Sequence, residues 1–483
     1  MSLIKTLHPL KMAPSRIETT QSPSTQCRDA TPIPDPTDKD HLLRRSFVEP
    51  PSLVDRAEGV NLYLSDGRTI IDACAGAAVA LIGHGNKEVH QAILNQLQKV
   101  SYVHTQSYTT QSAEDLANLI LRGSPHGLEK AFFVGSGSEA VESALKLARQ
   151  YYFEKNEHER LHVISRRQGY HGNTMASMSI SGNLARKVPF EGFSYPYTSQ
   201  VSPAFAYRYM QDGETENGYT ERLLRELEDE ILRVGSHRVM AFIAEPVAGS
   251  GVGCATPPSG YLAGVRNLCD KYGILLILDE IMCGVGRTGT FFAFEQEGNA
   301  APDIMTIAKG LGGGYAPISG VLVHKRVVDV LRHGSKAFNH GHTYQAHPTS
   351  CAAALAVQKI VVRDGLIERC AAMGKILEQM LRTELKDCWS VGDIRGRGLF
   401  WAVEFVKDKE TKEGFDPSIH FAARVQQAAF DNGVALYPCS GTVDGKKGDH
   451  VMISPPFIMA EEDLRTVCKV LREAIESQER QWS

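Results

Sequence analysis

Three stretches of the sequence place chemically capable residues directly after strand-like apolar runs. Lys309 follows "DIMTIA" and precedes a run of glycines, Asp279 ends "ILLILD", and "GSGSEA" (residues 135–140) joins "KAFFV" to an amphipathic stretch. A lysine at a buried strand end can be partly neutral, as Schiff-base formation requires. A carboxylate at such a place is costly to bury unless it has a partner. A helix that starts after a glycine turn can bind a phosphate.

The glycine turn by itself also fits the dinucleotide-binding fingerprint G-x-G-x-x-G/A. The next apolar run, "LHVISRR", ends in Arg166 and Arg167, as an NADP site does in some enzymes. A Walker loop is excluded, because its lysine follows the glycine-rich turn instead of preceding it. Taken singly, Asp279 can be a salt-bridged strand end and Lys309 a solvated lysine. Together with the turn they supply a phosphate seat, a pyridinium partner and an aldehyde-binding amine, which favours pyridoxal 5'-phosphate.

The elements that must position these residues alternate between strands and helices from about residue 95 to 345. Apolar runs such as "VMAFIAEP" and "ISGVLV" are separated by amphipathic stretches, which predicts an α/β fold with a mostly parallel sheet covered by helices. Ligands of such sheets collect at the carboxyl ends of the strands. We therefore expect the lysine, the aspartate and the glycine turn to lie at one edge of the sheet.

The pattern changes after the long helix predicted at "HPTSCAAALAVQKIVV". The remaining chain predicts a smaller α+β domain, joined by an N-terminal hairpin that turns at Asp66–Gly67. The predicted division is a flexible tail over residues 1–40, a segment over 41–90 that joins the small domain, a large cofactor-binding domain over 91–345, and a connecting helix with the small domain over 346–483.

Composition narrows the function classes. The chain has 483 residues, 42% of them hydrophobic and 22% charged, which is typical of a large globular protein. A formal net charge of −4 gives no general attraction to nucleic acid or to an anionic membrane. The ten cysteines show no metal-binding spacing, which predicts no metal and a reducing compartment. No apolar run is long enough for a membrane helix, so we expect a cytoplasmic protein.

The N-terminal tail leaves one alternative to that location. Its first 17 residues carry Lys5, Lys11 and Arg16 and no acidic residue, which permits a mitochondrial presequence. Pro9 and Pro14 weaken the amphipathic helix that such a presequence needs.

Six motifs occur in the order found in one enzyme family. They are "GSGSEAVESALKLAR", "GYHGNT", "AEPVAGSGV", "LILDEIMCGVGRTG", "AKGLGGGYAPISG" and "GHTYQAHPTSCAAALA". With them, residues 45 to about 478 resemble the class III pyridoxal-phosphate-dependent aminotransferases. The resemblance implies the fold type I architecture, with a large and a smaller domain, and a homodimer whose active sites lie at the subunit interface. It also implies transamination by a ping-pong mechanism.

The resemblance assigns a role to each matching residue. Lys309 would hold the cofactor as an internal aldimine and then move the proton between substrate and cofactor, and Asp279 would keep the pyridine nitrogen protonated. Arg395, in "DIRGRG", would bind a substrate carboxylate, although Arg397 lies close by in the sequence. His171 is expected to be a structural neighbour. The remaining cofactor-binding positions implied are Ser136, Gly137 and Ser138 at the phosphate, Tyr170 on the pyridine face, Glu245 close to the cofactor, and Thr343, which would reach the phosphate from the other subunit.

One departure from the family pattern bears on the substrate. Related ornithine and 4-aminobutyrate enzymes carry a second glutamate in E-P-x-x-x-E, whereas this chain reads Glu245-Pro246-Val247-Ala248-Gly249-Ser250. Ser250 therefore disfavours those two activities. The chain looks more like the branch that acts on amines or ω-amino acids with pyruvate as acceptor, with 2-oxoglutarate left open. The sequence does not identify the amine donor.

Three further interpretations stay open at this point. The first is another outcome on the same scaffold, such as an aminomutase or a decarboxylating transaminase. The second is an interaction protein that binds pyridoxal phosphate without turnover, which the complete set of chemically required residues disfavours. The third and most distant is a nicotinamide-dependent enzyme.

Overall fold

The computed structural model describes residues 41–47, 50–122, 126–298 and 300–482. The tail predicted over residues 1–40 lies outside these ranges. Residues 52–483 form one compact unit, to which all of the elements below belong. Within the described ranges, no helix is both long and apolar enough to cross a membrane.

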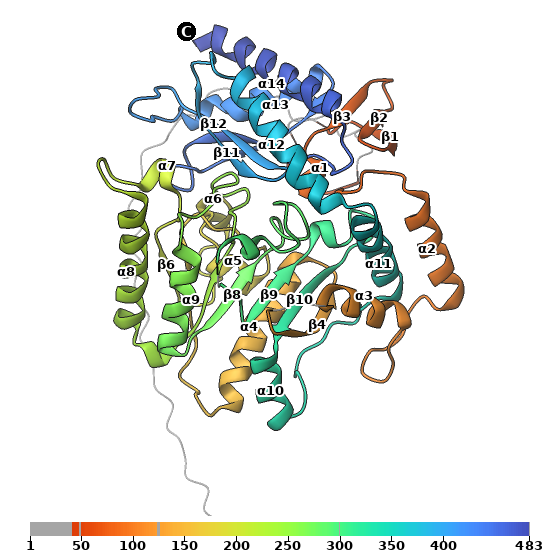
Figure 1. The fold of residues 1–483 in the computed structure, drawn as a ribbon, viewed down its shortest axis with the longest axis vertical. Coiled ribbons are helices and arrows are strands. Elements are labelled where there is room, and N and C mark those ends of the chain that lie inside the picture. The colour runs from red at the N-terminus through yellow and green to blue at the C-terminus, as the bar shows by residue number, and fades with distance from the viewer. Residues whose placement is uncertain (1–40, 48–49, 123–125, 299, 483) are drawn as a thin grey trace, which may run out of the picture. The chain divides into compact units, whose positions relative to one another are not determined.

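A seven-stranded sheet forms the centre of this unit (Figure 1), in the order β4-β10-β9-β8-β7-β5-β6. Neighbouring strands are parallel from β9 through β8, β7 and β5 to β6, whereas β10 runs antiparallel to both β4 and β9. The mostly parallel sheet predicted from the sequence is therefore confirmed. The strands are β4 (Leu128–Val134), β5 (His162–Arg166), β6 (Thr198–Val201), β7 (Val239–Ala244), β8 (Leu275–Asp279), β9 (Ile304–Ile307) and β10 (Ser319–His324).

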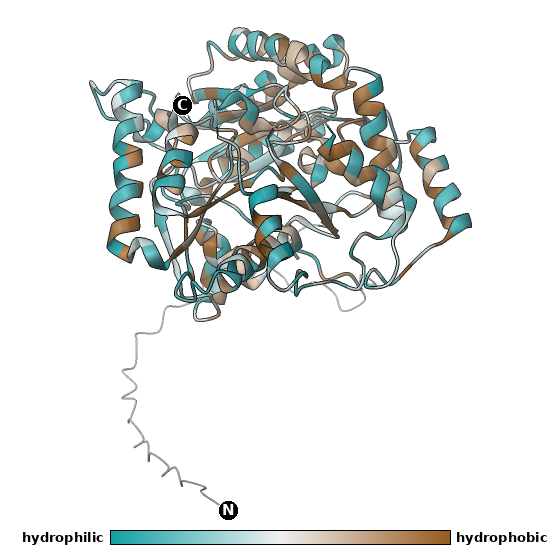
Figure 2. Ribbon diagram, turned by 60° about the horizontal axis from the view of Figure 1, so that its bottom comes forward, coloured by the Kyte–Doolittle hydropathy of each residue, from teal (hydrophilic) through white to brown (hydrophobic). Residues whose placement is uncertain are grey.

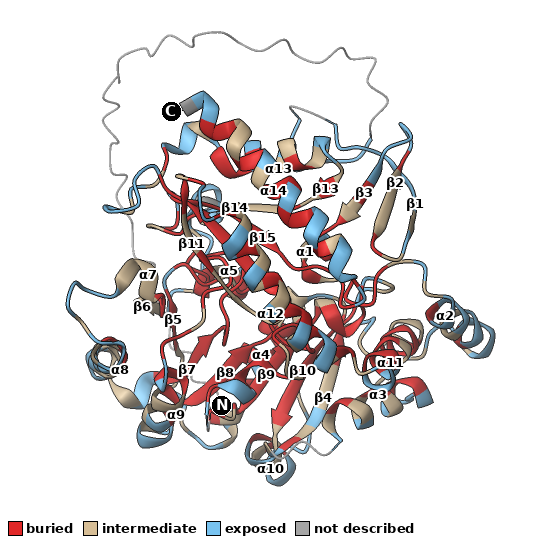
Figure 3. Ribbon diagram, turned by 45° about the horizontal axis from the view of Figure 1, so that its top comes forward, coloured by how far each residue is buried: buried red, intermediate tan, exposed pale blue. Residues whose placement is uncertain are grey.

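Both faces of this sheet are buried, which explains why its strands are apolar nearly throughout. Along β8, Leu275 and Ile277 pack into one apolar cluster with residues of α4, and Leu276 and Leu278 pack into another with residues of α8 and α9. Strand alternation sends successive side chains to opposite faces, so a strand covered on both sides needs apolar residues at every position. Figures 2 and 3 show this centre as the hydrophobic and buried part of the ribbon.

Helices cover the sheet and extend beyond its edges (Figure 1). Helix α4 crosses several central strands, α9 packs on β8, and α3 packs on β4. The helices up to α11 are α1 (Ala75–Ala78), α2 (Lys87–Lys99), α3 (Gln111–Leu121), α4 (Gly137–Glu154), α5 (Met175–Ile180), α6 (Leu184–Lys187), α7 (Ala206–Tyr209), α8 (Glu216–Val234), α9 (Tyr261–Tyr272), α10 (Lys325–His333) and α11 (Pro348–Arg363).

Two four-stranded sheets make up the smaller region. One is ordered β1-β2-β3-β13, and the other is an antiparallel sheet ordered β11-β12-β15-β14. Their strands are β1 (Val54–Glu58), β2 (Asn61–Leu64), β3 (Thr69–Asp72), β11 (Val391–Arg397), β12 (Phe400–Phe405), β13 (Val434–Ala435), β14 (Tyr437–Ser440) and β15 (Asp449–Ile453). The helices that pack with them are α12 (Leu366–Glu384), α13 (Phe421–Asp431) and α14 (Glu461–Trp482).

The hairpin predicted around Asp66–Gly67 joins β2 to β3. The N–H of Gly67 donates to the carbonyl of Leu64 over 3.0 Å, and Gly67 has a φ of +89°, which glycine adopts without a steric penalty. Strand β3 then pairs in parallel with β13, so the N-terminal hairpin is hydrogen-bonded to a strand more than 350 residues later in the chain. The domain boundaries at 90 and 345 stay a prediction.

Candidate active site

A cavity of about 410 Å³ lies at the carboxyl ends of the central strands. Its wall includes residues that directly follow β4, β7 and β9, the last residue of β8, and residues 170–172 in the loop after β5. This is the edge where ligands of open α/β sheets bind. Of the nine residues predicted to be catalytic, cofactor-binding or substrate-binding, seven line it: Ser136, Gly137, Ser138, Tyr170, Glu245, Asp279 and Lys309. Thr343 and Arg395 are not among the lining residues.

Lys309 follows β9 with an unusual backbone conformation. Its φ is +44°, in the left-handed region that L-residues with a Cβ adopt only at a cost. Burial lowers the pKa of the Lys309 amine, although the negative charges of Asp279 and Glu245 oppose this shift. A larger fraction of the amine is therefore neutral at a given pH than for a solvated lysine, which is what attack on a carbonyl carbon requires.

Asp279 ends β8 and is only 3% exposed. Its Oδ2 lies 2.7 Å from Nδ1 of His171, while its Oδ1 accepts hydrogen bonds from the N–H of Ile281 over 3.1 Å and from the hydroxyl of Thr306 over 3.2 Å. Contacts from three segments of the chain thus hold the carboxylate in one orientation at the cavity wall. They also satisfy a buried charge that would otherwise be very unfavourable.

His171 has a closer connection to the site than the sequence indicated. The sequence suggested a structural neighbour, whereas the structure places the buried imidazole against Asp279 and in the cavity wall. Its position next to Tyr170 in "GYHG" was the available signal. An imidazole N–H donated to Asp279 fixes the ring tautomer and the carboxylate together.

Glu245 follows β7 and is buried in the same wall. Its Oε2 accepts the N–H of Gly249 over 2.7 Å and its Oε1 accepts the N–H of Tyr170 over 3.2 Å. Burial raises the pKa of Glu245, and the nearby charge of Asp279 adds to that effect. The second carboxyl group is therefore easier to protonate than an exposed glutamate.

The two arginines considered for an NADP phosphate do not line the cavity. Arg166 is buried, and its guanidinium donates to the carbonyl of Glu245. Arg167 is exposed and contacts the hydroxyl of Ser202 and, at 3.6 Å, the carboxylate of Glu226. Arg166 therefore stabilises the end of β7 that carries Glu245.

The turn before α4 is closed by a capping box. The Ser136 hydroxyl accepts the N–H of Glu139 over 3.3 Å, and Oε2 of Glu139 accepts the N–H groups of Gly135 and Ser136 over 2.7 and 3.1 Å. Among the described residues, none accepts a hydrogen bond from the N–H of Gly137 or Ser138. These two donors at the positive end of the helix form a candidate anion site, of the kind that suits a phosphate.

Close packing surrounds this anion site. A Cβ added to Gly137 would lie 2.8 Å from Cδ1 of Ile281, so a larger residue would displace that side chain. The hydroxyl of Ser138 accepts the N–H of Asn173 over 3.0 Å, and the amide of Asn173 in turn donates to the hydroxyl of Tyr170 over 3.0 Å. The helix start and the Tyr170 ring are thus positioned by one shared residue.

Arg395, the predicted carboxylate ligand, is engaged elsewhere. Its NH1 lies 2.9 Å from Oδ2 of Asp393 and 2.7 Å from Oε2 of Glu404. Its Nε and NH2 donate to the carbonyls of Val252 and Gly253. Substrate binding by Arg395 stays a prediction, one that would require these contacts to be exchanged. Arg397, the other arginine of this motif, pairs with Glu297 at 2.7 Å.

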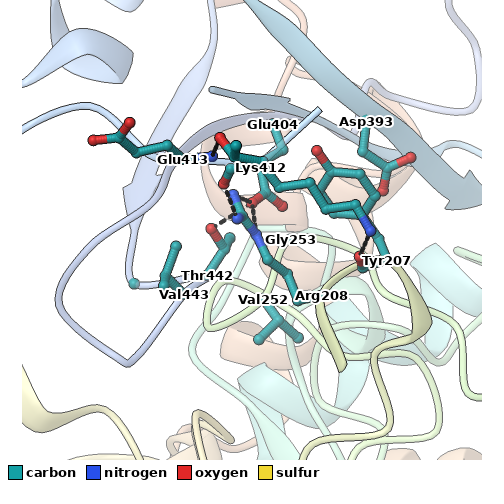
Figure 4. A network of polar contacts seen from close by, with 12 residues as sticks. Tyr207, Arg208, Val252, Gly253, Asp393, Glu404, Lys412, Glu413, Thr442 and Val443 are labelled. Atoms are coloured by element: carbon teal, nitrogen blue, oxygen red, sulfur yellow. Dashed lines mark hydrogen bonds and ion pairs between the residues drawn. The ribbon is translucent and has the colours of Figure 1, made fainter. Parts of the chain in front are cut away.

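Glu404 is the centre of this network, which Figure 4 shows. Besides Arg395, it accepts hydrogen bonds from Nε of Arg208 on α7 over 2.7 Å and from the hydroxyl of Thr442 over 2.7 Å. One buried carboxylate therefore joins α7, the sheet of β11 and β12, and the segment 441–448.

Thr343, predicted to reach the phosphate of the other subunit, is exposed on the chain and lies outside the cavity wall.

Comparisons with known proteins agree with this architecture. The family model of the class-III aminotransferases matches residues 44–475. An uncharacterized aminotransferase of Schizosaccharomyces pombe is 50% identical over 439 residues, covering 91% of this chain and 95% of the relative. A putrescine–pyruvate aminotransferase of Pseudomonas aeruginosa is 36% identical over 427 residues, covering 88% of this chain and 90% of the relative.

Two further comparisons are with a transaminase named for 2-oxoglutarate and with a solved structure. A diaminobutyrate–2-oxoglutarate transaminase of Halomonas elongata is 36% identical over 422 residues, covering 86% of this chain and 88% of the relative. The crystal structure of an amine transaminase from an uncultivated Pseudomonas species, in its PLP-bound form, superposes with a TM-score of 0.85 at 32% identity. It covers 91% of this chain and 98% of that one.

Proposed function

The chain belongs to the class III aminotransferases, a family that depends on pyridoxal 5'-phosphate, and from this premise we propose that it transfers an amino group from an amine or ω-amino acid to a keto acid, with pyruvate preferred. The observation that carries the proposal is the cavity in which Lys309, Asp279 and the start of α4 meet. These groups come from three separate strand ends, and together they meet the needs of this one cofactor.

The residues present fit the cofactor. Lys309 would hold it through its amine, whose lowered pKa favours the neutral form. The carboxylate of Asp279, held by His171, would face the ring nitrogen, and the N–H groups of Gly137 and Ser138 would bind the phosphate. When bound, the cofactor supplies an aldehyde that takes up the amino group and a ring that withdraws electrons from the reacting carbon.

The chain's own groups then carry the proton chemistry. With the cofactor bound, the Lys309 amine would act as a positioned general base and acid, taking the proton from the substrate carbon and delivering it to the cofactor carbon. The fixed carboxylate of Asp279 favours a protonated ring nitrogen, because an opposite charge in a buried place stabilises the cation. A ping-pong order is part of the proposal: the keto product of the donor would leave before the acceptor binds.

Two observations support pyruvate as the acceptor. Ser250 lines the cavity where ornithine and 4-aminobutyrate enzymes carry a second glutamate, so a different set of contacts must receive the substrate here. The similarity to a putrescine–pyruvate aminotransferase points in the same direction. Because a relative of similar identity is a diaminobutyrate–2-oxoglutarate transaminase, 2-oxoglutarate is the acceptor to be tested against pyruvate.

A homodimer is also part of the proposal. Thr343 is exposed and outside the cavity of its own chain, which suits a residue that reaches the phosphate site of a second copy. Mixing inactive Lys309→Ala and Thr343→Ala proteins under conditions of subunit exchange should then restore part of the activity. No restoration after verified exchange would contradict the shared site.

The cytoplasm is the proposed compartment. All nine cysteines in the described part of the chain are free, and eight of them are buried. Such a set of unpaired thiols suits a reducing environment.

A matrix of amine donors against pyruvate and 2-oxoglutarate tests the activity directly. The purified protein should absorb as a pyridoxal-phosphate enzyme, lose that absorbance with a donor, and regain it with the keto acid. Lys309→Ala should abolish turnover, whereas Lys325→Ala, which changes an exposed lysine at the start of α10, should retain it. Full activity of Lys309→Ala, or a colourless protein that binds NADP, would refute the proposal.

A further inference from the structure

The cavity wall lacks an obvious partner for the carboxylate of a keto acid. Of the described residues that line it, Lys309 is the one with a cationic side chain, and the proposed reaction already uses its amine. Glu245 and Asp279 add two acidic groups to the same wall. A carboxylate in a partly closed, acidic cavity needs a cation within hydrogen-bonding reach.

Neighbouring basic residues are already engaged. Arg166 donates to the carbonyl of Glu245, and Arg395 is held by two carboxylates and two carbonyls. Lys187 donates to the carbonyls of Ser179 and Ser181 over 2.9 Å each. Recruiting any of these cations would leave buried polar groups without their partner, which is costly.

Arg186, on α6, is different. Its guanidinium carbon lies over the Tyr170 ring, 5.0 Å from the ring centroid, and Tyr170 lines the cavity. The residue is exposed, and no hydrogen bond or ion pair joins its guanidinium to another residue of the described chain. A guanidinium that contacts a ring through its face keeps the N–H donors around its rim for another ligand.

The surroundings place Arg186 where the two regions of the protein meet. Burial raises the pKa of Cys439 on β14 to about 12, and the positive charge of Arg186 opposes that shift. Leu184 of the same short helix lies against Gly445 in segment 441–448. Arg186 thus contacts a residue of the cavity wall and lies on a short helix that packs against segment 441–448.

We propose that Arg186 is the specificity-determining cation that binds the carboxylate of the keto-acid acceptor at the mouth of the cavity. This inference rests on the proposed transamination and assigns to Arg186 the role that the sequence suggested for Arg395. Arg395 then serves to hold segment 252–253 and β12 together.

The test compares acceptors with and without a carboxylate. In Arg186→Leu, kcat/KM for pyruvate should fall at least about tenfold, mainly through KM, because a charge-assisted hydrogen bond is lost. With butanal as acceptor, kcat/KM should stay within about twofold. For Arg186→Lys, kcat/KM with pyruvate should lie between the values of the wild type and of Arg186→Leu. Arg225→Leu on α8, another exposed arginine, is the matched control and should match the wild type with both acceptors.

A binding measurement adds a second readout. Propionate should inhibit competitively against pyruvate, and its inhibition constant should rise in Arg186→Leu by a factor similar to the change in KM. An unchanged response to pyruvate and propionate would overturn the role of Arg186, and so would an equal loss with butanal. A wild-type protein that transfers no amino group would instead refute the proposed function itself, so the two failures are distinguishable.

Discussion

Glu404 should contribute more to stability than any exposed acidic residue of the small sheets. It is fully buried on β12 and lies within 2.7 Å of groups on Arg208, Arg395 and Thr442. In Glu404→Ala, Arg395 would keep Asp393 as a counter-charge. Arg208, only 7% exposed, would keep the carbonyl of Lys412 and no carboxylate.

The expected magnitude follows from this count of partners. Removing one member of a buried ion pair costs about 3–5 kcal/mol, because the other charge is left without compensation. Only Arg208 loses its counter-charge, since Arg395 keeps Asp393. We therefore expect Glu404→Ala to lower the free energy of unfolding by about 3–5 kcal/mol. Glu404→Gln keeps an acceptor oxygen at the same place and should lose less.

Urea unfolding followed by circular dichroism and by tryptophan fluorescence measures this difference. Glu410→Ala, an exposed glutamate shortly after the same strand, is the control and should change the free energy of unfolding by no more than about 0.5 kcal/mol. A loss for Glu404→Ala below about 1 kcal/mol would refute the reasoning, because the network would then contribute no more than exposed ion pairs do.

The dependence of the free energy of unfolding on pH tests the same network. Burial opposes ionisation, yet the guanidinium groups of Arg395 and Arg208 hold the pKa of Glu404 below its ordinary value of 4.5. A group with a lowered pKa in the folded state stabilises the protein above its unfolded pKa and loses that contribution as pH falls through the folded value. The stability difference between wild type and Glu404→Gln should therefore be constant above about pH 5.5 and shrink as the pH falls below about 4.5.

Three further predictions concern the cavity. His171→Phe removes one of the three donors to Asp279 and should lower kcat with pyruvate at least about tenfold, while thermal unfolding shows that the fold is intact. An unchanged kcat would show that the histidine does not act through the carboxylate. Gly137→Ala should weaken retention of pyridoxal phosphate on dialysis, because the new methyl group meets Ile281 at 2.8 Å, and adding Ile281→Ala should restore part of it; equal retention by both variants would contradict the steric explanation. Ser136→Ala should lower the free energy of unfolding by about 1 kcal/mol through loss of the N-cap, and a loss confined to cofactor affinity would contradict that reason.

Much of the large sheet could be predicted because burial on both faces leaves a local signature. Six of its seven strands coincide with apolar runs that stand out in the sequence, such as β8 over Leu275–Asp279. The exception is β6, Thr198–Val201, which reads "TSQV" and lies at the edge of the sheet. The opposite direction of β10 was not predicted either, since strand direction depends on the connection and not on the strand's own residues.

The candidate site was predictable where its chemistry follows strand ends, and less so where it depends on distant contacts. Asp279 and Lys309 could be found because the first ends a recognisable strand and the second closely follows one. The contact of His171 with Asp279 joins residues 108 positions apart, and no local pattern encodes it. The position of Arg395 in its motif likewise does not indicate that Glu404 lies close to it, because that contact depends on how β11 pairs with β12.

The turn before α4 shows how the structure separates two cofactors that share a sequence fingerprint. A pyrophosphate presents two phosphate groups, so the turn that receives it must offer donors along its whole length. In this protein, Glu139 takes the N–H groups of Gly135 and Ser136 for itself. The free donors are then those of Gly137 and Ser138, at the first turn of the helix, which is enough for one phosphate. The same carboxylate would repel a second phosphate at the start of the turn, so the residue that closes the capping box also disfavours a dinucleotide.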